Sequence, residues 1–176
     1  MDIITKIDLT EPILPGQGIG QIRLLENAFS LRKFILSNTL SGQKISWTFT
    51  TNPQFPDWLT LNYMDNLLVG INIYTGKITS LTVKNNYKGK VFGTIGVGSL
   101  VSDLFNIDAN FYYDEVDEYI LHRDDINIQF DLDLMNRLTF TEDEVLSSRI
   151  TEITILNHEQ STTIVGATEF PKEWTK

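Results

Sequence analysis

The stretch that decides the fold is LLVGINIYTGKITSLTVK, residues 67–84. Val, Ile and Thr, which are common in strands, dominate it, and much of it alternates between apolar and polar side chains. Near its middle stands Thr75-Gly76, and glycine tolerates the positive φ of a tight hairpin turn. We therefore predict two antiparallel strands, Leu67–Tyr74 and Lys77–Lys84, joined by Thr75-Gly76.

The same pattern recurs along the chain, whereas helical patterns are few. Further strands are predicted over Asp2–Leu9, Gly18–Leu25, Ile45–Thr51, Trp58–Tyr63, Val91–Ile95, Glu118–His122, Ile126–Leu132 and Ile150–Leu156. The segments on either side of Arg123-Asp124-Asp125 form a second predicted hairpin with an acidic exposed face. Two short helices are predicted, Ala28–Leu36 and Ser99–Phe105, the second with Ser99 as its amino-terminal cap.

These elements predict an α+β fold, a mostly antiparallel β-sheet with two short helices, in a single domain over residues 1–176. A glycine-containing segment precedes each helix and several strands follow it, so residues 1–90 and 91–160 are candidates for related halves, each a strand, a helix and a meander. The repeat has no fixed period and little identity, so chance similarity stays the alternative. No linker rich in Pro, Gly or Ser separates the halves, which favours a shared core. The tail, residues 161–176, is predicted to be partly loose.

Charge is distributed unevenly along the chain. Thirteen of the 23 acidic residues lie from Asp108 to Glu152, where three arginines are the only positively charged residues, so the net charge of this segment is −10. The rest of the chain has a net charge of +1, which gives the total of −9. A concentrated charge of one sign attracts partners of the other sign and raises their association rate. The alternative is a solvated acidic face that serves solubility.

Aromatic side chains are interleaved with these acids. Tyrosine beside carboxylate is a composition suited to a surface that anchors a basic protein. The alternative is that the aromatic rings face the core and the acids only solvate the strand edge. On the first interpretation, the predicted partner-binding residues are Tyr112, Tyr113, Asp114, Glu115, Asp117, Glu118, Tyr119, Asp124, Asp125, Asp131 and Asp133.

The residue types that catalysis and metal binding require are scarce. The chain has no cysteine, which excludes disulfides, thiolate zinc sites and a cysteine nucleophile. Its two histidines, His122 and His158, are far apart in sequence, no Gly-x-Ser-x-Gly motif occurs, and Gly93-x-x-Gly96-x-Gly98 lacks the spacing of a phosphate-binding loop. We predict no catalytic residue, no metal site and no cofactor. The alternative is an acid-rich hydrolase, because 23 acidic residues offer many pairs of carboxylates for glycoside cleavage.

The same composition bears on partners and location. A pI near 4.6, without a large cluster of Lys and Arg, argues against nucleic-acid binding. No apolar run approaches the roughly 20 residues of a membrane span, and the first residues lack the pattern of a secretory signal. We predict a cytoplasmic protein that binds neither nucleic acid nor membrane.

A family resemblance rests on an ordered set of short motifs. In this sequence they are Gly18-x-Gly20-x-Ile22-x-Leu24, Ile73-x-Thr75-Gly76-Lys77-Ile78, Tyr87-Lys88-Gly89-Lys90, Ile95-Gly96-Val97-Gly98 with Val101-x-Asp103-Leu104, and Glu118-Tyr119. With these motifs the chain resembles bacterial immunity proteins encoded beside polymorphic toxins, of the contact-dependent inhibition or type VI and Rhs type. The resemblance spans Gly18 to Ile155, although the glycine spacing is irregular and Lys44–Asn66 has no counterpart.

The resemblance implies a function but no catalytic residue. It implies a protein that inhibits a co-encoded toxin by covering its active site or its substrate-binding surface. The acidic segment would then imitate the phosphates of a nuclease substrate or pair with the basic groups that hold that substrate. Two alternatives stay open: an intracellular acidic binding or assembly module without a toxin partner, and the acid-rich hydrolase.

Overall fold

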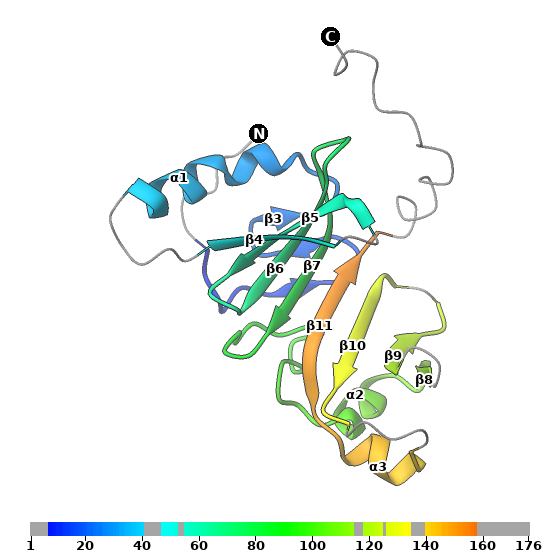
Figure 1. The fold of residues 1–176 in the computed structure, drawn as a ribbon. Helices are drawn as coiled ribbons and strands as arrows, with labels where there is room; N and C mark the ends of the chain where they lie inside the picture. Colours follow the sequence, from blue (N-terminus) through cyan, green and yellow to red (C-terminus); the bar gives the residue numbers. More distant parts are fainter. Residues whose placement is uncertain are drawn as a thin grey trace.

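Two antiparallel sheets and three short α-helices make up the described part of the computed structural model, residues 7–40, 47–52, 55–114, 118–124, 126–134 and 140–157. The predicted α+β class is confirmed (Figure 1). The three-stranded sheet contains β1 (Ile13–Leu14), β2 (Gly18–Ile19) and β3 (Ile22–Arg23). The eight-stranded sheet contains β4 (Trp47–Asn52), β5 (Phe55–Tyr63), β6 (Leu67–Asn72), β7 (Lys77–Lys84), β8 (Phe111–Asp114), β9 (Tyr119–His122), β10 (Ile128–Leu132) and β11 (Ile150–Leu156).

The large sheet joins two four-stranded meanders through their last strands. Its order is β4-β5-β6-β7-β11-β10-β9-β8, and β7 pairs antiparallel with β11. The first meander therefore runs inward from β4, and the second runs inward from β8 (Figure 1). This order leaves β4 and β8 at opposite ends of the described sheet.

The predicted hairpin forms, with a longer connection than expected. Asn72 pairs with Lys77, so four residues rather than two link β6 to β7. The side-chain oxygen of Asn72 accepts hydrogen bonds from the backbone N–H groups of Tyr74 and Thr75, both at 3.1 Å. Asn72 thereby ends its strand early, because a side-chain acceptor offers the backbone an alternative to the ladder. Gly76 adopts the expected positive φ, 65°.

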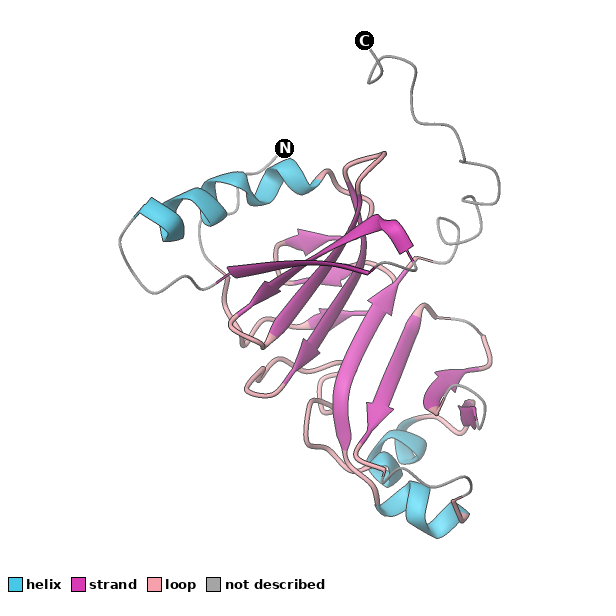
Figure 2. Cartoon of the chain, in the orientation of Figure 1, coloured by secondary structure: helices cyan, strands magenta, loops and turns pink. Residues whose placement is uncertain are grey.

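The helices lie at two ends of the molecule (Figure 2). A 3₁₀ turn, Ala28–Leu31, leads into α1 (Arg32–Leu40), whereas α2 (Val101–Ile107) and α3 (Glu142–Ser147) lie near each other. The third helix was not predicted. The predicted cap at Ser99 is wrong: Leu100 precedes α2 without a side-chain cap, and the Ser99 hydroxyl accepts from the N–H of Gly96 at 3.0 Å.

Two predicted strands are wrong in detail. Val91–Ile95 is a turn closed by one bridge between its end residues, because Phe92 and Gly93 both have positive φ. Gly18–Leu25 is the short hairpin of β2 and β3, bent at Gly20, whose φ is 54°. In the region predicted as Asp2–Leu9, the described residues from 7 onward form no strand.

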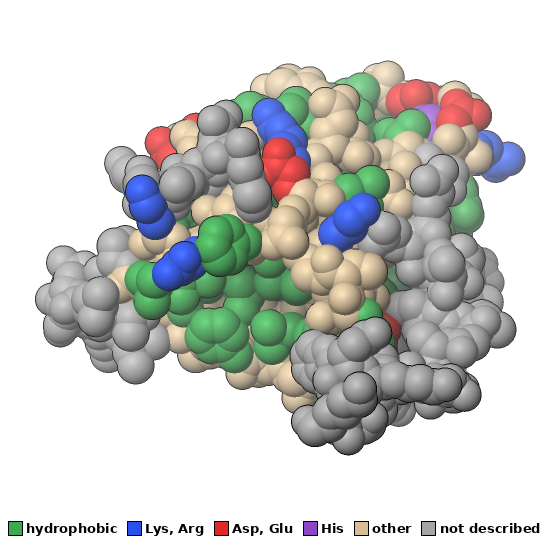
Figure 3. All heavy atoms as spheres, turned by 90° about the horizontal axis from the view of Figure 1, so that it is seen from above, with side chains coloured by type: hydrophobic (Ala, Val, Ile, Leu, Met, Phe, Trp, Pro, Cys, Tyr) green, Lys and Arg blue, Asp and Glu red, His purple; other side chains and the backbone are tan. Residues whose placement is uncertain are grey.

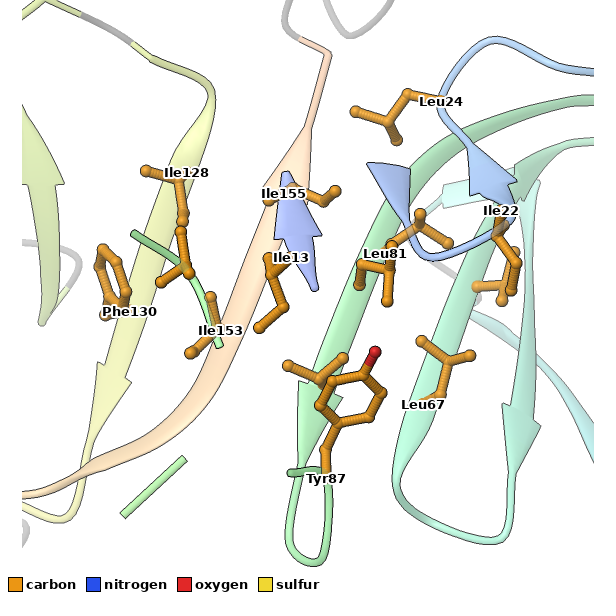
Figure 4. Close-up of a cluster of buried hydrophobic side chains, with 14 of the residues drawn as sticks. Ile13, Ile22, Leu24, Leu67, Leu81, Tyr87, Ile128, Phe130, Ile153 and Ile155 are labelled. Atoms are coloured by element: carbon orange, nitrogen blue, oxygen red, sulfur yellow. The ribbon is translucent and has the colours of Figure 1, made fainter. Parts of the chain in front are cut away.

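Cross-strand register gives the large sheet one apolar face. Ile153 of β11 faces Val83 of β7 and Phe130 of β10, and all three side chains are fully buried. The small sheet contributes Ile13 and other side chains to the same core (Figure 4). Because side chains alternate across a strand, the opposite face carries the intervening residues, and we call it the polar face.

A tyrosine fastens the loop after β7 to the segment before β1. Tyr87 is 2% exposed, and its hydroxyl donates to the carbonyl oxygen of Glu11 at 2.8 Å. Gly89 lies against the same carbonyl, where a Cβ would collide with it. Glycine is therefore required at position 89 by close approach of two backbone segments.

Candidate functional site

Carboxylates from three strands line up on the polar face. Asp114 of β8 pairs with Tyr119 of β9, Tyr119 with Asp131 of β10, and Asp131 with Glu152 of β11. Glu152 in turn pairs with Lys84 of β7. Directly paired residues point to the same face of a sheet, and neighbouring strands lie about 4.8 Å apart. Asp114, Asp131 and Glu152 therefore form a band, which we call the acidic row, about 15 Å long.

Lysine compensates one end of the acidic row. Lys84 Nζ lies 3.7 Å from Glu152 and 3.0 Å from Asp65, in the turn between β5 and β6. The hydrogen bond to Asp65 is the main reason that the pKa of Lys84 is raised, and the same bond lowers the pKa of Asp65. Lys84 is shared between Asp65 and Glu152, so its single positive charge offsets only part of the negative charge of these two carboxylates.

Asp131 lies in the middle of the row, where its surroundings disfavour the ionised form of its carboxyl group. Burial, and secondarily the negative charge of Glu152, raises the pKa of Asp131 to about 6. A carboxyl group with this pKa stays partly protonated until the pH approaches neutrality. A cation brought next to Asp131 would favour the ionised form and lower this pKa.

An aromatic hollow lies at the β8 edge of the sheet, on the side of α2 and α3. It has a volume of about 350 Å³ and opens between β8, α2 and α3. Tyr112 lies in its wall, and the guanidinium of Arg123 is 5.9 Å from the centre of the Tyr112 ring. The other lining residues are Phe105, Phe111, Tyr113, Phe140, Glu142, Val145 and Leu146. An apolar hollow beside carboxylates suits the stem and head of a long basic side chain.

The predicted binding residues separate into distinct places. Asp114, Tyr119 and Asp131 come together in the acidic row, and Tyr112 lies on the same face in the adjacent cross-strand row. Tyr113 packs instead against the hydrophobic core, because it pairs with the fully buried Ile120. For Tyr113, the core-facing alternative is therefore the one observed.

Three other predicted residues lie outside the row. Glu118 occupies the turn before β9 with φ of 60°. Asp124 follows β9 at the end remote from Tyr119, and its N–H donates to His122 Nδ1 at 3.1 Å. Asp133 accepts from the backbone N–H of Arg149, so it connects the segment after β10 with the start of β11. Glu115, Asp117 and Asp125 lie outside the described residues.

Two members of the site were missing from the predicted set. Glu152 and Lys84 join Asp131 only through the pairing of β11 with β10 and β7. The alternation within Ile150–Leu156 places Glu152 on the polar face, but its neighbours come from strands distant in sequence. Alternation within this strand could have identified Glu152 as a candidate site residue. It could not have predicted that Glu152 lies beside Asp131, which belongs to another strand.

His122, the histidine among the described residues, connects two parts of the fold. His122 Nε2 lies 3.1 Å from a carboxylate oxygen of Asp108, and the ring contacts Phe111 edge-on at 4.8 Å between centroids. With Nδ1 accepting from the backbone, His122 fixes the residue after α2 to the end of β9. His158 lies outside the described residues.

Among the described residues, no group of three or more metal-ligating side chains has the geometry to hold an ion. Nor does any helix in that part of the chain have the length and hydropathy needed to cross a membrane.

Comparison with known proteins informs the fold. No family model matches the sequence, and no curated protein matches it. The structure is similar to the crystal structure of the uncharacterized protein yfeY from Escherichia coli, with a TM-score of 0.52 and 12% sequence identity over 86% of this chain and 100% of that chain. At this identity the likeness shows a shared fold alone.

Proposed function

We propose that this protein is an immunity protein that binds a co-encoded basic toxin domain and neutralises it by occupancy, in the cytoplasm and without catalysis. The observation that carries the proposal is the acidic row, in which carboxylates of β8, β10 and β11 share one face of the sheet and Lys84 at its end is divided between Glu152 and Asp65. The toxin class is taken from the family resemblance.

The electrostatics of the row favour a cationic ligand. Asp131 is kept partly buried next to Glu152 at the expense of its ionisation. Lys or Arg side chains of a partner would relieve that cost and form charge-assisted hydrogen bonds. A line of carboxylates about 15 Å long also imitates a stretch of phosphates, so it would compete with nucleic acid for a basic nuclease surface.

The neighbouring hollow would add an anchor. Binding energy at protein interfaces concentrates in aromatic and arginine side chains near the centre of the contact. Tyr112 and Arg123 line the hollow, and Tyr112 is on the same strand as Asp114. The charge of the row would raise the association rate, and the apolar area of the hollow would lower the dissociation rate.

The test is a titration of the purified chain against its co-encoded toxin, with residual nuclease activity or toxicity as the readout. We expect inhibition to reach completion near a one-to-one ratio. Complete inhibition by a small substoichiometric amount, with the toxin or its product altered chemically, would favour the hydrolase alternative. Stable one-to-one binding to an unrelated basic protein with no effect on the toxin would favour the binding-module alternative.

A pair of charge reversals locates the surface. Asp114→Lys and Glu26→Lys change the net charge equally, but only the first lies in the acidic row. We expect Asp114→Lys to weaken inhibition about tenfold or more and Glu26→Lys to leave it within about twofold. Equal losses in both variants, with folding intact, would mean that net charge rather than this row governs binding.

A further inference from the structure

The strand at the other end of the large sheet carries no charge. β4, with the sequence WTFTTN, is six residues long, and β5 is its neighbour in the described sheet. Thr48, Phe49, Thr50 and Thr51 are exposed, and Phe49 is 57% exposed. Protein sheets normally protect an edge with charged residues, proline or a short strand, since an open edge pairs readily with another strand.

The opposite end shows how this protein protects an edge. β8 has four residues, ends at Asp114 and is followed by the acid-rich residues 115–118. β4 is longer, and between residues 41 and 56 the only charged residue is Lys44. Within the described part of the chain, one edge of the sheet is thus defended by charge, and the other, β4, pairs with β5 alone.

An apolar surface accompanies the open edge. Leu36 on α1 is 45% exposed, and Trp47, at the start of β4, packs edge-on against Phe34 of α1 with 5.3 Å between ring centroids. Figure 3 shows hydrophobic side chains gathered on the face seen from above, with Lys and Arg at their border. A strand that adds to β4 would cover part of this apolar surface.

We propose that β4 pairs antiparallel with β4 of a second copy of this chain, which makes a symmetric dimer with one continuous sheet. The distribution of charge favours a second copy of this chain as the partner of β4. The segment with a net charge of −10 forms the β8 end of the sheet, so joining two copies at β4 keeps their acidic ends as far apart as the fold allows. Because β4 has no charged residue, two β4 strands can pair without like-charge repulsion between them.

Side-chain direction fixes the register of the pair. Phe49 pairs with Leu61 of β5, so it points to the apolar face, as do Trp47 and Thr51. Paired residues must share a face, and a two-fold axis at Phe49 satisfies this. Phe49 then faces Phe49 of the second copy, and Trp47 faces Thr51 of the second copy. This register removes the exposed ring of Phe49 from water.

Sedimentation velocity over a wide concentration range tests the dimer. We expect a monomer–dimer equilibrium that Thr50→Lys shifts toward monomer by about tenfold or more in dissociation constant. Thr50 is exposed, so the change leaves the monomer fold intact. Thr94→Lys, an equal charge change at an exposed turn, is the control and should leave the equilibrium unchanged.

Because the chain has no cysteine, single cysteines report the register directly. Phe49→Cys should form an interchain disulfide on mild oxidation, since directly opposed residues lie about 5 Å apart between Cα atoms. Thr51→Cys, on the same strand and face, would be more than about 13 Å from its counterpart and should not crosslink. The experiment is independent of any toxin.

Three results would overturn the dimer. They are a wild-type chain that stays monomeric at the highest concentration, equal crosslinking of the two cysteine variants, and a Thr50→Lys variant that loses toxin inhibition while the wild type shows no self-association. The last result would assign the edge to a strand of the partner instead of a second copy.

Discussion

Asp131 shows how one side chain links the stability of this protein to its surface. Its backbone position is fixed by β9 and β11 on either side, and its carboxyl is partly buried beside Glu152. The folded chain therefore favours the protonated form of this carboxyl more than the unfolded chain does. A group of this kind stabilises the fold at low pH and stops doing so as pH rises through its folded pKa.

We predict that Asp131→Asn stabilises the protein at pH 8 and has little effect at pH 4. The folded pKa is about 6 against an ordinary value of 3.8, so at pH 8 ionised Asp131 opposes folding and at pH 4 it is already protonated in the fold. The gain should be about 1 kcal/mol, after allowance for the solvent that screens a partly exposed group. Urea denaturation at both pH values measures it.

Glu26→Gln is the control for Asp131→Asn because it removes an exposed charge outside the acidic segment. It should change the free energy of unfolding by less than about 0.5 kcal/mol at either pH. A destabilised Asp131→Asn variant at pH 8 would contradict the assignment and would mean that the carboxylate has a favourable partner in the fold.

At the scale of elements, α3 is held by its cap. The Thr141 hydroxyl accepts from the N–H of Glu144 at 3.3 Å, and the Glu144 carboxylate accepts from the N–H of Thr141 at 2.9 Å. This capping box satisfies two backbone donors that a helix otherwise leaves unpaired. α3 has only six residues, so its first turn makes up most of the helix.

We predict that Thr141→Ala lowers the free energy of unfolding by about 1 kcal/mol, the usual cost of losing a cap. Glu144→Gln is the matched variant, because glutamine also accepts from the N–H of Thr141 and preserves the box. It should cost clearly less than Thr141→Ala in the same thermal or chemical denaturation. Equal losses in the two variants would show that charge at the helix start, not the cap, stabilises α3.

At the scale of the whole molecule, the sheet separates two kinds of surface. Its β8 end carries the acidic row and the aromatic hollow, and its β4 end is uncharged, with exposed threonines and Phe49. The two proposed contacts therefore lie at opposite ends of the eight-stranded sheet. A dimer joined at β4 would leave two acidic surfaces exposed, and each could bind a toxin molecule.

We predict that association with the proposed basic partner slows steeply as salt rises and strengthens as pH rises from 5 to 7.5. Salt screens exposed charges beyond about 8 Å at physiological ionic strength. The pH effect follows because binding favours ionised Asp131, whose pKa is about 6 in the free protein, so a proton is released on binding. Stopped-flow kinetics and calorimetry in two buffers measure the two effects.

Asp131→Asn should abolish most of the pH dependence while the salt dependence persists, since Asp114 and Glu152 keep their charges. An association rate insensitive to salt would contradict electrostatic attraction by this surface. Unchanged pH dependence in Asp131→Asn would assign the titrating group elsewhere.

The sequence by itself determined the elements whose signals are local. Alternation and β-branched residues identified the hairpin over residues 67–84, and the predicted strand Ile150–Leu156 has the bounds observed. Composition also located the acidic segment that supplies Asp114 and Asp131. Short elements with mixed signals were missed or misjudged: α3 was not predicted, and the glycine-containing turn at Val91–Ile95 was predicted as a strand.

Only the tertiary structure decided which of those residues meet. Period-2 alternation says which side chains share a face within one strand, but not which strands lie side by side. Pairing of β11 with both β10 and β7 brought Glu152 between Asp131 and Lys84, and pairing of β8 with β9 turned Tyr113 toward the core. These pairings depend on burial of a shared apolar face by strands distant in the chain, a cooperative property that no single segment of sequence contains.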